Sequence, residues 1–343
     1  MTAPDTTDHS PILGTVPLGD QWPTVDPFLF CAHHNDAYPA GDGAMAPAAP
    51  LGGRAIGSDF SGLDGWSMYH GSSVPGFPQH PHRGFETVTF CRRGLIDHAD
   101  SLGATARFGR GDVQWMTAGS GVVHSEMFPL VDTEAGNHTE LFQVWLNLPA
   151  SDKFVDPYFT MLWADDIPTI TLEDGATITV IAGELDGVKP PPPPPNSWAA
   201  RPEADLAIWH IVMPENSSWT LPATHANTQR VLYAFDGGSV SVAGEVHGAG
   251  TGVELAADQA VDLVGGADGI ELVLLQGRPI AEPVARYGPF VMNTDAEIQQ
   301  AFDDYNQTGF GGWPWDRDDP VHPSAEGRFA IHADGRRENA TSD

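Results

Sequence analysis

The stretch GDVQWMTAGSGVVHSEMF, residues 111–128, contains two short strand-like runs with glycines between them. Apolar, aromatic and β-branched residues are concentrated in 112–118 and in 122–128, and Gly119 and Gly121 provide the turn. Similar runs, each bounded by glycine or a polar turn, lie at 85–91, 95–101 and 140–148. Turns at a spacing of about 8–12 residues are typical of β-sandwiches and barrels. The stretch therefore predicts an all-β domain.

The second half of the chain repeats this pattern. Strand-like runs occur at 205–213, 230–238, 239–246 and 270–277. The 343 residues include 38 Gly and 30 Pro, so turns are frequent and long helices are not expected. The length is sufficient for two domains of ordinary size. We therefore expect two β units in tandem.

One helix is expected near the end of the chain, in NTDAEIQQAFDDYNQTG (293–309). Thr294 followed three residues later by Glu297 is a capping-box pattern, and Gly309 is a stop signal. The segment that follows, 310–329, is predicted to be an irregular tail.

Two other segments look irregular. Residues 1–20, rich in Thr, Asp and Pro, are expected to form a flexible tail. Six consecutive prolines, 190–195, cannot join the interior of a sheet and predict an exposed polyproline II segment. We interpret this run as a surface insertion rather than a docking site for a proline-recognition domain.

Composition restricts the partners and the location. Acidic residues number 46 and basic residues 16, giving a net charge of −30, which disfavours nucleic acids and anionic membranes. Cys31 and Cys91 form neither a disulfide framework nor a CxxC motif. No signal-peptide pattern and no run of about 18 apolar residues is found. A cytoplasmic location is expected.

The stretch HPHRGFETVTF (80–90) carries the first candidate for chemistry. On a strand His80 and His82 share one face, whereas on a helix they would point about 200° apart. Pro81 stiffens the pair. In VVHSEMF, His124 and Glu126 have the same spacing on another strand, with about two strands expected between the pairs. In a small barrel both pairs can point into one interior.

Three imidazoles and one carboxylate form a plausible metal-ligand set. Four protein ligands would close a tetrahedral structural zinc site, whereas an octahedral ion would keep two open positions for substrate and O₂. Ligand type alone leaves iron, nickel, copper and manganese as alternatives.

The central motifs resemble the pirin family of the cupin superfamily. The similarity lies in HPHRGFETVTF, DHADSLG, GDVQWMTAGSGVVHSEMFP, FQVWLNLPASDK and GRPIAEPVARYGPFVMNTDAEIQQAFDDY, and extends from about residue 25 to about 310. It implies two tandem cupin (jelly-roll-like β-barrel) domains with a short C-terminal helix. The expected division is a metal-binding cupin at 21–155, a second cupin at 156–283, and a segment at 284–343 that packs on the first.

The resemblance also implies a ligand set. One mononuclear divalent metal, most commonly iron, with nickel, copper, manganese, cobalt and zinc as alternatives, would be held by His80, His82, His124 and Glu126. Many cupins take their carboxylate from the position of Glu86 instead. We therefore expect Glu86 to hydrogen-bond a ligand or the substrate, in a supporting catalytic role.

The chain departs from the family between DPFL (26–29) and HPHRG. The usual segment is short, whereas here residues 30–60 contain an insertion rich in Gly, Ala and Pro, at about 32–58. The resemblance therefore does not define the mouth of the pocket. The adjacent His33 and His34 are interpreted as loop residues.

Several other residues are interpreted as structural. The second cupin has no HxH motif and is expected to lack metal, because His210, His225 and His247 are isolated. His98 is expected to be a hydrogen-bonded structural histidine. Aromatic and sulfur residues near the motifs are assigned mainly to the core: Phe85, Phe90, Trp115 and Met116.

Two functions follow from the resemblance. One is quercetin 2,3-dioxygenase activity, in which a flavonol binds the metal, O₂ is incorporated and carbon monoxide leaves, with Glu126 as ligand and proton acceptor. The alternative is a metal- and redox-dependent regulator that binds a protein partner without turnover. The expected small-molecule partners are a flavonol-like aromatic substrate and O₂.

Overall fold

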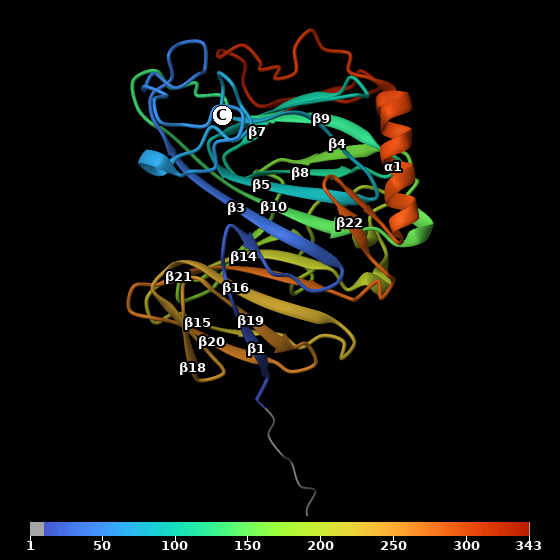
Figure 1. Cartoon of the computed structure of the whole chain (residues 1–343). Helices are drawn as coiled ribbons and strands as arrows, with labels where there is room; N and C mark the ends of the chain where they lie inside the picture. Colours follow the sequence, from blue (N-terminus) through green and yellow to red (C-terminus); the bar gives the residue numbers. More distant parts are fainter. Residues whose placement is uncertain (1–9, 343) are drawn as a thin grey trace, which may run out of the picture. The chain divides into compact units, whose positions relative to one another are not determined.

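The computed structural model of the chain describes residues 10–342 and confirms the all-β prediction with one α-helix near the C-terminus (Figure 1). The chain forms two compact units. The larger unit comprises 28–167, 191–200 and the residues from 280 onward. The smaller unit comprises the residues up to 27, together with 168–190 and 201–279.

The larger unit contains two large antiparallel sheets that enclose a common core, and a separate two-stranded sheet of β22 and β23. Its strands are β3 (Phe28–Tyr38), β4 (Gly76–His82), β5 (Phe85–Arg93), β6 (Leu95–Asp100), β7 (Thr105–Gly109), β8 (Asp112–Thr117), β9 (Val122–Met127), β10 (Asn137–Asn147), β11 (Tyr158–Leu162), β22 (Ala285–Tyr287), β23 (Phe290–Met292), β24 (Phe329–Ile331) and β25 (Arg337–Asn339).

One sheet of the larger unit has the order β11-β8-β5-β10-β3, and the other has the order β25-β24-β7-β6-β9-β4. Both layers are visible in the upper part of Figure 1. Cys91 and Met116 from the first sheet and Ile96 and Phe108 from the second belong to one buried cluster. Burying the apolar faces of the two sheets against each other is the main stabilising term for such a sandwich.

The smaller unit has the same architecture. Its long sheet has the order β1-β19-β16-β21-β14-β13-β12, and the short one has the order β15-β20-β17-β18. Trp209 and Leu232 from the first and Val240 and Leu263 from the second share a buried core. The strands are β1 (Ile12–Pro17), β2 (Gln21–Trp22), β12 (Thr169–Thr171), β13 (Thr177–Ala182), β14 (Ala207–Met213), β15 (Ser218–Leu221), β16 (Gln229–Gly237), β17 (Ser239–Val242), β18 (Glu245–Gly248), β19 (Thr251–Ala256), β20 (Val261–Gly265) and β21 (Ile270–Gly277).

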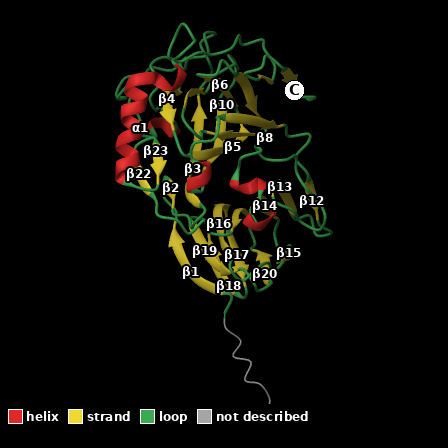
Figure 2. Ribbon diagram, turned by 90° about the vertical axis from the view of Figure 1, so that its right-hand side faces the viewer, coloured by secondary structure: helices red, strands yellow, loops and turns green. Residues whose placement is uncertain are grey.

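Helix α1 (Asp295–Thr308) has the predicted bounds. The side-chain oxygen of Thr294 accepts a hydrogen bond from the backbone N–H of Glu297, and Gly309 ends the helix with φ +57°. The helix contacts β22 and β23, as the two views in Figures 1 and 2 show. The short 3-10 helices are η1 (Leu63–Gly65), η2 (Ala150–Asp152), η3 (Trp198–Ala200), η4 (Pro202–Ala204) and η5 (Gly309–Gly311). Within residues 10–342, no helix has the length and apolar character needed to cross a membrane.

The two predicted tails are partly wrong. Residues 1–9 of the N-terminal tail lie outside the described residues, but Ile12–Pro17 form β1, which pairs with β19. Residues 310–328 of the second tail form no strand, as expected, but its last residue, Phe329, begins β24, which pairs with β7 and with β25. Strands β1 and β24 are short and lie among polar or proline-rich residues, so the strand pattern of their own sequence is weak. Pairing with a strand distant in sequence is what orders them.

The proline run also differs from the prediction. It forms no strand, as expected, but Pro194 is buried, and so are Ser197 and Trp198 just after it. Residues 191–200 belong to the larger unit, although 168–190 and 201–279 on either side belong to the smaller one. The run is therefore exposed or half-buried except at Pro194, and it is followed by two buried side chains that belong to the larger unit.

Candidate metal centre

The two histidine pairs predicted from the sequence lie on neighbouring strands. Strand β4 carries His80 and His82, β9 carries His124 and Glu126, and His80 is directly opposite His124 in the antiparallel register. Four strands, β5 to β8, separate β4 from β9 along the chain, rather than about two. The pairing is possible because β9 inserts between β6 and β4 at the edge of one sheet.

The three imidazole rings form a compact group. The ring centroids of His80 and His124 are 4.5 Å apart, and that of His82 is 4.8 Å from each of them. One ring nitrogen from each residue lies within 4.8 Å of the others. Two nitrogens bound to one ion at about 2.1 Å can be up to about 4.2 Å apart, so small ring rotations would bring all three to a single ion.

Hydrogen bonds fix which nitrogen of His80 and His82 is available. The Nδ1 atoms lie 2.9 Å from the carbonyl oxygen of Pro78 and 3.4 Å from that of Pro289, respectively. A carbonyl oxygen can only accept, so each Nδ1 carries the proton and each Nε2 keeps its lone pair. A hydrogen bond from the nitrogen that does not bind the ion is what orients histidine ligands in metal sites.

His124 provides the observation that tests whether a metal fits. Its side chain is fully buried, yet neither ring nitrogen has a hydrogen-bond partner. A buried polar atom without a partner costs about 1–3 kcal/mol, so native structures rarely leave one. An ion bound to His124 would satisfy one of these nitrogens, and the donor set of three neutral imidazoles suits iron, nickel, copper or zinc.

Burial also favours the neutral form of these imidazole rings, which is the form that can bind a metal. It lowers the pKa of His80 to about 4 and places the pKa values of His82 and His124 well below the usual range. Neighbouring histidines lower all three further. At neutral pH the rings are therefore uncharged, which is the form that binds metal.

Glu126 lies beside this group. Its Oε2 is 3.9 Å from Nε2 of His124, and Nε2 of Gln143 on β10 donates to Oε2 at 2.8 Å and to Oε1 at 3.1 Å. Burial raises the pKa of Glu126, and the hydrogen bond from Gln143 opposes the rise. The compact group contains the three histidines without Glu126, whose role as a fourth ligand remains a prediction.

The expected hydrogen bond between Glu86 and a histidine ligand is not found, and the contact of Glu86 with a substrate stays a prediction. Glu86 accepts hydrogen bonds from the hydroxyls of Thr117 and Ser197, both at 2.6 Å, and no bond joins it to the three histidines. The period-2 count from His82 fails because a turn at Gly84, with φ +83°, separates β4 from β5, which belong to different sheets. Phe85 therefore faces His82, with ring centroids 5.0 Å apart, and Glu86 faces the other side of β5.

Other predicted neighbours have defined places. Nε2 of His98 lies 3.2 Å from Asp100, as expected for a hydrogen-bonded histidine, and its ring is 5.5 Å from that of His124. Met116 is part of the core, and Trp115 and Phe90 are buried. Phe85 lies against both His82 and Trp145 and so lines the centre.

Gln143 and Trp145 were missed by the sequence reasoning. The indole N–H of Trp145 donates to Oε1 of Gln143 at 3.2 Å, so Trp145 fixes the amide that holds Glu126. The available signal was a polar glutamine inside the apolar run ELFQVWLNL.

The loop interpretation of His33 and His34 is wrong. Both lie on β3, paired with Phe142 and Leu141 of β10. They point to opposite sides of the strand: His33 bonds Glu140 at 3.1 Å, and His34 bonds the hydroxyl of Tyr69 at 2.8 Å. Pairing with the long β10 extends β3 into the insertion, which local composition does not reveal.

The histidines of the smaller unit lie apart from one another. His210 on β14 pairs with Glu271 at 2.9 Å, His225 is exposed in a loop, and His247 is on β18. That the second domain lacks a metal remains a prediction.

Comparison with known proteins agrees with this architecture. Residues 13–146 match the Pirin family model, and 208–311 match the model of the Pirin C-terminal cupin domain. A Pseudomonas aeruginosa protein named "putative quercetin 2,3-dioxygenase" is 37% identical over 68% of this chain and 79% of its own. A pirin-like protein of Solanum lycopersicum is 35% identical over 80% of this chain and 89% of its own.

A solved structure shows the same fold. The crystal structure of a quercetin 2,3-dioxygenase from Acinetobacter baumannii covers 88% of this chain and 98% of its own, with a TM-score of 0.69 and 28% identity. The expected pair of cupin domains is thereby confirmed. With two matching family models and relatives above 30% identity along most of the sequence, the chain belongs to the pirin family.

Proposed function

We propose that this protein is a metal-dependent dioxygenase that opens the central ring of a flavonol such as quercetin. The observation that carries the proposal is the compact group of the half-buried His80 and the buried His82 and His124, whose ring nitrogens lie within 4.8 Å of one another, with Glu126 at its side. The names of the Pseudomonas and Acinetobacter relatives support the choice of reaction. Iron is the metal that we propose first, in keeping with the family.

The residues of the chain have separate tasks in this proposal. The three histidines would hold the ion, and a bound divalent ion would supply a Lewis acid for the substrate and a site for reaction with O₂. Glu126 takes the proton of the substrate hydroxyl onto its carboxylate, either as a fourth ligand or from beside the ion. Gln143 keeps that carboxylate turned toward His124.

The site also controls access of water. His82 and Glu126 are each 4% exposed and His124 is fully buried, while Phe85 and Trp145 pack beside His82. Apolar surroundings that exclude water would strengthen the interaction of the ion with an anionic substrate oxygen.

The test is an aerobic assay of metal-loaded protein with quercetin. Protein stripped with a chelator is reloaded separately with iron, nickel, copper, manganese or cobalt, and carbon monoxide and the loss of flavonol absorbance are measured. We expect turnover with at least one metal and none with the His80→Ala, His124→Ala double variant. If no metal supports turnover by the wild-type protein, the flavonol form of the proposal is wrong.

A further inference from the structure

The connection between β3 and β4, residues 39–75, which includes most of the insertion at about 32–58, is held together by buried contacts. Within it, Nη1 of Arg54 donates to Asp59 at 2.9 Å and to the carbonyl of Trp66 at 2.8 Å, while Nη2 donates to the carbonyl of Leu63. The guanidinium also lies 3.3 Å from the ring centroid of Trp66. Because the side chains of Arg54 and Asp59 are only 1% exposed, the ion pair between them holds the segment 54–66 in one shape.

Tyr69, at the end of this segment, is held in an unusual conformation. Its φ is +54°, a left-handed value that is costly for an aromatic residue. Two backbone hydrogen bonds with Asp59, both 2.8 Å, fix the main chain. The hydroxyl donates to Asp36 at 2.8 Å and lies 2.8 Å from Nδ1 of His34. These contacts together compensate the strain and fix the ring.

The fixed ring of Tyr69 belongs to a series that reaches the metal histidines. Tyr69 stacks on Phe77 at 5.1 Å with an interplanar angle of 26°, and Phe77 meets the ring of His80 edge-on at 6.3 Å. On the outer side, Phe60 lies 5.4 Å from Tyr69 and 6.5 Å from Phe77. The rings therefore form a continuous aromatic wall, defined as Phe60, Tyr69 and Phe77, that ends at His80.

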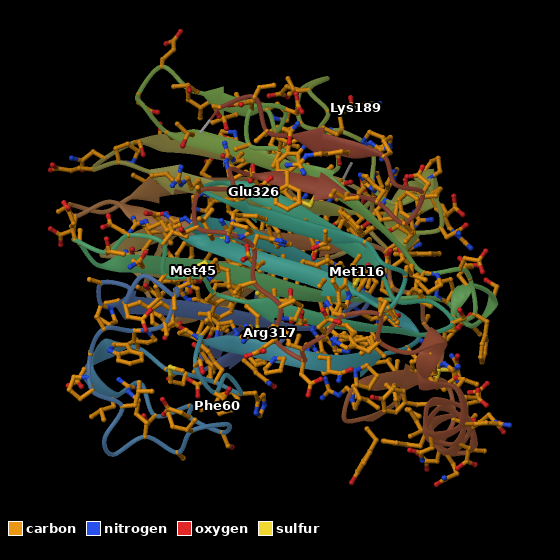
Figure 3. All side chains as sticks on the ribbon, turned by 90° about the horizontal axis from the view of Figure 1, so that it is seen from above. Met45, Phe60, Met116, Lys189, Arg317 and Glu326 are labelled. Atoms are coloured by element: carbon orange, nitrogen blue, oxygen red, sulfur yellow. The ribbon has the colours of Figure 1, made fainter. Side chains whose placement is uncertain are left out.

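The wall is open to a ligand at its outer end. The side chain of Phe60 is 57% exposed, and Phe77 and His80 are half-buried, whereas His82 and His124 are buried. Figure 3 shows Phe60 on the loops that join β3 to β4, drawn in blue. A phenylalanine held open on a rigid loop leaves apolar area that a planar ring can cover.

We propose that the aromatic wall binds the ring of a planar aromatic ligand whose oxygen atoms reach the ion at His80. We further propose that Phe60 determines the preference of the site for aromatic over aliphatic ligands. The proposal rests on the proposed function for the metal at the three histidines, but it does not depend on reaction with O₂. It assigns substrate selection to Phe60, the last residue of the segment 30–60 that departs from the usual family pattern.

The experiment compares two metal-chelating probes that differ only in their apolar part. Acetohydroxamate and 2-naphthohydroxamate bind a metal through the same pair of oxygens, but only the second carries a planar aromatic ring. Their dissociation constants are measured anaerobically on Ni²⁺-loaded protein, after the metal content of every variant has been verified. The variants are Phe60→Ala, Phe60→Trp and Phe60→Leu.

Phe154→Ala is the matched control, because Phe154 is 55% exposed and lies outside the wall. We expect Phe60→Ala to weaken binding of the naphthyl probe about fivefold and to leave acetohydroxamate unchanged, since one ring–ring contact is lost. Phe60→Trp should keep the wild-type affinity for the naphthyl probe, whereas Phe60→Leu should show the same loss as Phe60→Ala. Equal effects on both probes, no effect of Phe60→Ala, or the same loss in Phe154→Ala would overturn the proposal.

The outcome is separable from that of the quercetin assay. Selective loss of naphthyl binding without any flavonol turnover supports the wall and rejects the dioxygenase. Flavonol turnover that is unaffected by Phe60→Ala, together with unchanged probe affinities, supports the enzyme and rejects the wall.

Discussion

The side-chain amide of Gln143 donates to both carboxylate oxygens of Glu126, at 2.8 and 3.1 Å. The two residues come from strands of opposite sheets, β10 and β9, so the contact spans the interior of the larger unit. A carboxylate held in this way cannot turn away from His124 without losing two hydrogen bonds.

Replacing Gln143 by leucine should weaken metal binding about tenfold or more, because residues that orient ligands typically contribute 10- to 100-fold to metal affinity. The measurement is competition for the metal with a chelator of known affinity. Gln143→Glu should weaken binding at least as much, because a second buried carboxylate would face Glu126. Unchanged affinity in both variants would show that Glu126 does not act on the metal.

Loss of the histidines should remove the metal altogether. The His80→Ala, His124→Ala double variant leaves one imidazole of the three, and metal content measured after purification and dialysis should fall to background. His225→Ala, an exposed histidine of the smaller unit, is the control and should keep the full content. Equal metal in the double variant and the wild type would mean that the ligands are elsewhere.

Glu86 should make stability depend on pH. Burial raises its pKa from 4.5 to about 7, so the folded chain binds a proton more readily than the unfolded chain, and stability falls as pH rises from about 4.5 to 7. Glu86→Gln carries no charge and escapes this penalty. The variant should therefore gain unfolding free energy relative to the wild type at pH 8, by up to about 3 kcal/mol, and gain little at pH 4.5.

The measurement for Glu86 is denaturant unfolding of metal-free protein at the two pH values. In the variant one of the hydroxyls of Thr117 and Ser197 can still donate to the amide oxygen and the other can rotate to accept from the amide NH₂, so both contacts should be kept. A variant that is less stable than the wild type at pH 8 would show that the ionised carboxylate is favoured in the folded protein.

Arg107 should be required for the stability of the larger unit. It is fully buried, pairs with Asp97 through Nε at 2.7 Å and Nη2 at 2.8 Å, and donates to the carbonyls of His322, Pro323 and Glu326. Arg107→Ala leaves a buried, unpaired carboxylate and should lower the unfolding free energy by about 3–5 kcal/mol.

Arg317 offers the comparison for this prediction. Arg317 lies in the C-terminal segment and, like Arg107, pairs with an aspartate, in this case Asp319. The side chain of Arg317 is 53% exposed. Arg317→Ala should cost less than about 1 kcal/mol, because exposed ion pairs contribute little. Equal losses in the two variants, measured by denaturant unfolding, would contradict this reading of Arg107.

The sequence was informative where structure is set by neighbours along the chain. Strands β5, β6, β8, β9 and β10 and the cap at Thr294 follow from alternation, turn glycines and the capping box, all of which act within a few residues, whereas β7 was not predicted. The shared face of His80 and His82 could also be predicted, because the spacing of two residues stays within one strand.

The errors arise where distant segments decide the structure. The turn at Gly84 moves Glu86 to the other side of its sheet, and a count of alternate residues cannot detect a change of sheet. His33, β1 and β24 are ordered by pairing with strands far away in sequence, and their own composition resembles that of loops. Gln143 was missed because its partner Glu126 lies on the opposite sheet, so no spacing along the chain links them.

The bond between His82 and the carbonyl of Pro289 has a consequence for synthesis of the chain. A ribosome makes the histidine pair before Pro289, and Pro289, which orients His82, comes only after the whole stretch 201–279 of the smaller unit has been made. Ser197, the partner of Glu86, is also made after β13 of that unit. The centre at His80, His82 and His124 can therefore reach its final form only after Pro289 has been made, and a nascent chain halted before Pro289 carries all four predicted ligands without the setting that positions them.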